Sequence, residues 1–142
     1  MADPYMSNAD DAAERVVVVE QWLRKAERDL ASARRLLDGE PPFLDTAVYH
    51  CQQAAEKALK GFLASRDRPV RKVHDLVLLL DECICLAPSL ELLSDEAAIL
   101  TPYGTAFRYP GDMNEPEMGD ASEAVAAARR VIEHIRAVLN AA

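Results

Sequence analysis

Apolar residues recur every three or four positions along most of this chain, with polar residues between them. That spacing is typical of amphipathic helices, and no stretch alternates apolar and polar residues as a strand would. The predicted helices cover 14–37, 44–65, 74–86, a segment that starts at Ser94, and the stretch from Asp120 onward.

Glycine and proline mark where these helices end. The run 38–42 places a glycine and then two prolines after the first helix, and Pro88 closes the third. Thr101-Pro102 is expected to break or kink the fourth. Short connections between amphipathic helices predict an all-α fold, an antiparallel up-and-down bundle of four to five helices.

The predicted domain spans residues 14–142, after a polar and acidic stretch at 1–13 that we expect to be a disordered tail. A chain of 142 residues suits one domain. Its net charge of −8 excludes a protein that coats nucleic acid with its whole surface, because phosphate binding needs positive charge. A local basic patch remains compatible with that total.

The helix predicted over 44–65 has a broad apolar face rich in alanine, which lets a neighbouring helix approach closely. That face comprises Ala47, Val48, Cys51, Ala54, Ala55, Ala58, Leu59, Phe62 and Leu63. The polar residues Tyr49, Gln53, Glu56, Lys57 and Lys60 are expected mainly on the opposite side. Together with the first helix it offers more apolar surface than a small bundle buries once, which favours a homodimer.

The cysteines and the glycines exclude several kinds of chemistry. Cys51, Cys83 and Cys85 lie in apolar helical patterns without Cys-x-x-Cys spacing, so we predict no disulfide framework, no metal and a cytoplasmic location. The apolar run 16–19 is too short to span a membrane, and we expect no membrane association. No phosphate-cradling glycine loop and no Gly-x-Ser-x-Gly elbow occurs, and no cofactor is predicted.

Positive charge is concentrated between residues 57 and 74. Six cations, Lys57, Lys60, Arg66, Arg68, Arg71 and Lys72, are opposed there only by Asp67, a local charge of 6 − 1 = +5. Lysine and arginine in that density can hold a phosphate, arginine through its bidentate fork. The structural alternative is a solvated loop with helical ion pairs such as Glu56 to Lys60.

Three motifs resemble the HEPN domain family: the run 49–60 with its Gln-Gln-x-x-Glu-Lys-x-x-Lys pattern, His74-Asp75-Leu76, and Arg108-Tyr109-Pro110. The resemblance covers about residues 16–140. It implies an all-α bundle, usually dimeric, and in prokaryotes a partner of a minimal nucleotidyltransferase in two-component or toxin–antitoxin systems. Many such proteins are metal-independent ribonucleases that use an Arg, then four to six residues, then a His.

This sequence departs from that ribonuclease pattern, because no histidine occurs in 109–118 after Arg108. Arg68 and His74 have five residues between them, but they precede the third helix rather than open a late one. Arg129 and His134 have four residues between them, and on one helix they would lie about 140° apart. The comparison therefore favours binding over cleavage.

The main hypothesis is a nucleotide- or RNA-binding partner protein without a catalytic centre of its own. Its expected ligand-binding residues are Lys57, Lys60, Arg66, Arg68, Arg71, His74, Arg108 and Tyr109. Tyr109 could stack on a base or be the side chain that a nucleotidyltransferase modifies. A structural reading of the same motif is a helix end at which the tyrosine packs and Arg108 bonds carbonyls.

Two alternatives stay open. One is a ribonuclease in which His74 acts as acid–base and Arg68 or Arg108 stabilises the phosphate. The other is a purely structural interaction module.

Overall fold

A computed structural model describes residues 8–69, 72–111 and 114–141 of the chain. Its elements are α1 (Asn8–Asp38), α2 (Leu44–Ser65), α3 (Leu76–Leu86), the 3-10 segment η1 (Pro88–Leu93), α4 (Ser94–Leu100), the 3-10 segment η2 (Thr101–Gly104) and α5 (Met118–Ala141). The predicted all-α bundle is confirmed, and the described ranges contain no strand.

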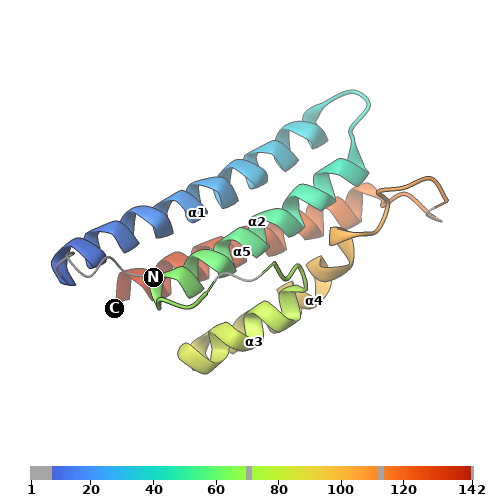
Figure 1. Cartoon of the computed structure of the whole chain (residues 1–142). Coiled ribbons are helices and arrows are strands. Elements are labelled where there is room, and N and C mark those ends of the chain that lie inside the picture. Colours follow the sequence, from blue (N-terminus) through green and yellow to red (C-terminus); the bar gives the residue numbers. More distant parts are fainter. Residues whose placement is uncertain (1–7, 70–71, 112–113, 142) are drawn as a thin grey trace.

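Three long helices form the body of the bundle, with α2 packed against both α1 and α5 (Figure 1). The first helix runs antiparallel to the other two, as the colours along the chain show (Figure 1). The shorter helices α3 and α4 lie at one side of this body and return the chain to the end where α5 begins. None of the described helices is long and apolar enough to cross a membrane.

Every residue of the predicted apolar face of α2 is buried, so that prediction is confirmed. The expectation for the polar side is wrong for Glu56 and Lys60, which are only 4% and 6% exposed, and Gln52 is fully buried as well. The reason lies in the tertiary packing around α2. Because α1, α5, α3 and η2 all pack on α2, little of its circumference remains in contact with water.

Several helix boundaries differ from the predicted ones. Helix α1 begins at Asn8, six residues before the predicted start, so the expected tail is helical over 8–13, and 1–7 fall outside the described residues. Helix α3 begins at Leu76, because the Asp75 carboxylate accepts the amide hydrogens of Val77 and Leu78 and caps the helix. The break at Thr101-Pro102 is confirmed.

Gly61 marks a close approach of α2 to α1. A Cβ atom added there would lie 3.0 Å from the Cβ of Trp22. That atom is bonded directly to the backbone, so a change of rotamer cannot move it away. The absence of a side chain at this position therefore lets the two helices pack together.

We expect Gly61→Ala to destabilise the fold. Overpacking of this kind costs about 1–3 kcal/mol, and the better helix propensity of alanine offsets only about 1 kcal/mol of it. The measurement is the free energy of unfolding in urea. Gly119→Ala is the matched control, because nothing lies within 4 Å of its added Cβ, and equal effects of both changes would contradict the packing argument.

Candidate functional site

A cleft of about 500 Å³ opens where α2, the start of α3 and the η2 turn meet. Most of the residues that line it are of polar types, and they come from segments far apart in the sequence. The lining residues are Tyr49, Gln52, Gln53, His74, Asp75, Thr101, Gly104, Thr105 and Arg108.

His74 is held at the cleft by two contacts to α2. Its ring Nδ1 lies 3.0 Å from Oε1 of Glu56, and its backbone carbonyl accepts a hydrogen bond of 3.1 Å from the Gln52 amide. The His74 side chain is 73% exposed, whereas the Glu56 side chain that it contacts is buried. The ring is therefore bound to the bundle through Nδ1 and is otherwise open to solvent. Because Nδ1 faces Glu56, Nε2 is the ring atom available to a ligand.

Beneath the histidine lies a buried network of polar side chains. Lys60 Nζ is 3.2 Å from Oε2 of Glu56, and both side chains are nearly inaccessible to solvent. Gln52 donates to Glu56 over 3.3 Å and accepts from Gln53 over 2.8 Å. Buried charges are tolerated when they are paired and hydrogen-bonded in this way.

Arg108 also lines the cleft. Its guanidinium carbon lies 4.7 Å from the ring centre of Tyr49 and 5.6 Å from that of Tyr109, which are favourable cation–π distances. It also donates to the Gly104 carbonyl over 3.1 Å, so it bonds a carbonyl at a helix end, as the structural reading proposed. The aromatic contacts orient the guanidinium while it stays solvent-exposed.

Two backbone features bring the segment 104–108, which carries Arg108, close to α2. A Cβ on Gly104 would lie 3.3 Å from Cδ of Gln52, so glycine allows η2 to approach α2 closely. Phe107 has a φ of 65°, a left-handed conformation that costs a non-glycine residue energy. Its ring packs against Tyr103, 6.2 Å between centres, and this packing helps to hold the turn that places Arg108.

Of the seven expected ligand-binding residues that the structure describes, His74 and Arg108 line this cleft. Lys60 lies under His74, bound to Glu56, rather than on the surface. Lys57 is on the α1 side of α2, where its Nζ lies 2.5 Å from Asp29, a carboxylate that also contacts His50. Tyr109 is exposed beside Arg108.

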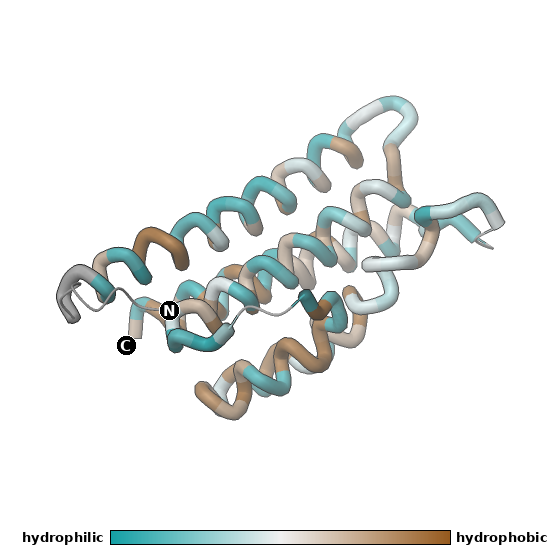
Figure 2. Tube along the Cα trace, viewed as in Figure 1, coloured by the Kyte–Doolittle hydropathy of each residue, from teal (hydrophilic) through white to brown (hydrophobic). Residues whose placement is uncertain are grey.

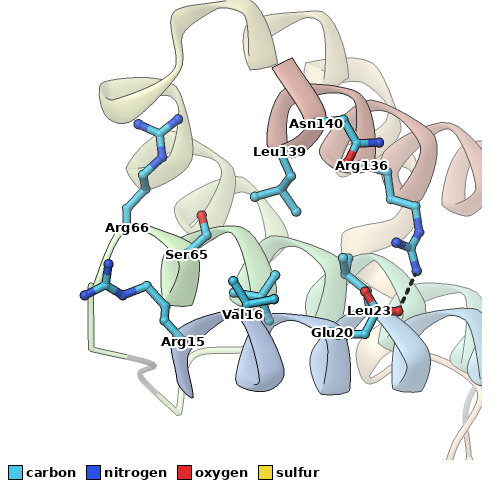
Figure 3. A pocket seen from close by; sticks show the side chains of 10 residues that line it. Arg15, Val16, Glu20, Leu23, Ser65, Arg66, Arg136, Leu139 and Asn140 are labelled. Atoms are coloured by element: carbon cyan, nitrogen blue, oxygen red, sulfur yellow. Dashed lines mark hydrogen bonds and ion pairs between the residues drawn. The ribbon is translucent and has the colours of Figure 1, made fainter. Parts of the chain in front are cut away.

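Arg66 and Arg68 lie just beyond the C-terminal end of α2. Arg66 stacks over the Phe62 ring at 5.1 Å and lines a separate cavity with Arg15, at one side of it (Figure 3). On the far side of that cavity Arg136 pairs with Glu20. Arg68 lines two further hollows, and Arg71 lies outside the described residues. The described part of the basic run is therefore spread along α2.

Sequence reasoning missed most of the polar lining residues as site residues, among them Tyr49, Gln52, Gln53 and Thr105. The Gln-Gln-x-x-Glu pattern was a usable signal, since consecutive amides followed one turn later by an acid can form a hydrogen-bonded network on one helix. No sequence signal shows that η2 would pack across that pattern.

Among the described residues, the structure does not bring the other candidate catalytic or metal-binding side chains together. Arg68 does not line the cleft of His74, and His134 bonds the Arg130 carbonyl over 2.8 Å within α5. No three potential metal-ligating side chains gather in the described residues. Burial raises the pKa of Cys51 and of Cys83 to about 12, so both thiols stay protonated at neutral pH.

A family model described as the HEPN domain matches residues 19–138, most of the chain and all of the cleft. The chain belongs to the HEPN domain family. TT1696 from Thermus thermophilus is 27% identical, with a TM-score of 0.71 over 83% of this chain and 95% of that one. ST0689, an archaeal HEPN homologue, is 28% identical, with a TM-score of 0.65 over 84% and 95%. No curated protein matches significantly.

The buried pair in this HEPN domain makes a testable stability prediction. Lys60→Met removes the cation and leaves the Glu56 carboxylate buried with only a histidine and an amide, which costs about 3–5 kcal/mol of the free energy of unfolding. The double variant Glu56→Gln/Lys60→Met should recover much of that loss, because no buried charge remains. Chemical denaturation measures both, and a double variant no more stable than Lys60→Met would contradict the pairing argument.

Proposed function

We propose that this HEPN-domain protein binds a phosphate-bearing ligand, a nucleotide or an RNA, in the cleft between His74 and Arg108. One observation carries the proposal: two cationic or protonatable side chains far apart in the sequence line the same polar cleft. Each side chain is oriented by neighbouring groups: His74 contacts the Glu56 carboxylate, and Arg108 makes cation–π contacts to two tyrosine rings.

The chemistry of the lining fits a phosphate attached to a polar group. A guanidinium engaged through its face by Tyr49 still has N–H groups at its edge, which suit a phosphate oxygen. Protonated His74 would add a second positive charge, and Gln53 and Thr105 can exchange hydrogen bonds with a base or sugar. The volume is within the range of small-molecule sites.

The cations outside the cleft would contribute to binding of an RNA but not of a mononucleotide. Arg66 and Arg68 follow the C-terminal end of α2 and do not line the cleft, but they could contact the phosphates of a longer RNA. Lys57 and Arg71 are proposed for the same outer role, and Lys60 acts indirectly by holding Glu56. A mononucleotide would then depend on the cleft alone, and an RNA on both regions.

The test is the affinity of AMP and of a ten-nucleotide RNA for the full-length protein at low salt. We expect His74→Ala and Arg108→Ala each to weaken both ligands about tenfold, since a charge-assisted hydrogen bond contributes roughly 1.5–3 kcal/mol. Arg129→Ala, an exposed arginine on α5, is the control and should change neither affinity.

Arg66→Ala with Arg68→Ala should weaken the RNA only. Absence of binding by the wild-type protein, or equal losses in the Arg129 control, would overturn the proposal and leave a structural interaction module.

A second candidate, the metal-independent ribonuclease, is favoured by one specific contact. A carboxylate against Nδ1 of an exposed histidine is an arrangement that orients the ring for proton transfer at Nε2. We expect that, if the protein cleaves RNA in EDTA, His74→Ala abolishes cleavage and Arg129→Ala does not. Binding without cleavage would exclude this candidate and keep the main proposal.

Assembly with other chains is a further part of the proposal. Membership of the HEPN family supports a homodimer and a complex with a minimal nucleotidyltransferase, for which a toxin–antitoxin pair is one setting. In such a complex the exposed Tyr109, next to the cleft arginine, is the side chain that we propose for modification.

A further inference from the structure

The outer face of α3 is unusually apolar for a surface in contact with water. The helix buries Leu76, Leu79, Leu80 and Cys83 against the bundle. Away from them, Val77 and Leu78 are 42% and 55% exposed, and Cys85 is exposed as well. An exposed helix face is normally polar, and a helix that is apolar all round is normally buried.

Helix geometry groups the exposed residues on one side. At about 100° per residue, Leu78, Asp81 and Cys85 fall within about 60° of one another, roughly opposite Cys83, with Val77 beside them. We call Val77, Leu78, Asp81 and Cys85 the α3 outer face. Helix α3 lies at the edge of the bundle (Figure 1), and its tube is coloured mainly as hydrophobic (Figure 2).

The charge around this face is mainly negative, and Arg68, which lines a hollow with Cys85 and Glu82, is a cation at its edge. Residues 73–107 contain six acidic residues and no lysine or arginine. Asp81 is exposed on the face itself, and Glu91 and Asp95 are exposed on the η1 and α4 segments that pack beside α3. Leu92, on η1, is 72% exposed and extends the apolar character of this region.

We propose that the α3 outer face is a docking surface for a basic amphipathic helix of another protein. Apolar side chains of that helix would cover Val77, Leu78 and Cys85, and its lysines or arginines would lie near Asp81, Glu91 and Asp95. One partner would then contact both the apolar side chains and the carboxylates of this surface.

Charge decides against two other occupants. A second copy paired through a two-fold axis on this face would bring Asp81 close to the Asp81 of the copy, and like charges at short range repel. An anionic lipid surface would be repelled by the same carboxylates. A cationic partner is the occupant that the surface favours.

The test uses the full-length protein and a synthetic helical peptide with leucines at i, i+3, i+4 and i+7 and lysines at the other positions. Fluorescence anisotropy of the labelled peptide gives its affinity. We expect Val77→Ser with Leu78→Ser to weaken binding about tenfold or more, because the peptide would lose two apolar side chains from the contact.

Asp81→Asn should weaken binding by a smaller factor, about twofold to fivefold at low salt, and should reduce its salt dependence. Val17→Ser is the matched control, because Val17 is an equally exposed aliphatic residue on α1, and it should leave the affinity unchanged. The exchanged side chains are solvent-exposed, and thermal unfolding monitored by circular dichroism verifies that each variant is folded. The bound peptide should also slow alkylation of Cys85, the exposed thiol on the face.

Three results would overturn the proposal. A peptide of the same composition with its leucines spread evenly around the helix should bind much more weakly; equal binding would mean charge attraction alone. Unchanged affinity of the Val77/Leu78 variant would place the peptide elsewhere. Loss of a dimer in sedimentation of that variant would mean that a second copy covers the face.

Discussion

The carboxylate of Glu56, buried halfway along α2, is the group on which the arrangement of the cleft depends. A buried charge must be compensated, and here the compensation comes from within the helix by Lys60 and Gln52 and from outside it by His74. The His74 contact ties the segment before α3 to the centre of the bundle. The same interaction therefore neutralises a buried charge and positions a candidate ligand-binding side chain.

Two side chains that line the cleft are held by different kinds of contact. His74 rests on a network within the bundle, whereas Arg108 belongs to a turn that contacts α2 through aromatic stacking and the close approach of Gly104 to Gln52. The Arg108 side chain remains exposed to solvent beside these contacts.

Helix α3 links this cleft to the second surface of interest. Its first residues follow His74 and Asp75, and its outer face carries exposed apolar side chains within an acidic region. The cleft meets α3 at its N-terminal end, at His74 and Asp75, and the proposed docking surface begins at Val77 and extends along the helix to Cys85. In this HEPN domain of net charge −8, the two proposed sites differ in the charge of the ligand that each would attract.

The order of residues was enough to specify the helices and the bundle, because apolar spacing and the prolines at 88 and 102 act locally. Its resemblance to the HEPN motifs also predicted roles for His74 and Arg108, and both residues line the cleft. Which polar residues meet was settled by tertiary packing. Glu56 and Lys60 have the spacing of a surface pair, yet packing of α3 and η2 over α2 buries them, and the basic run separates along the helix instead of converging. Helical periodicity specifies which face a residue occupies, but the burial of that face depends on chain segments tens of residues away.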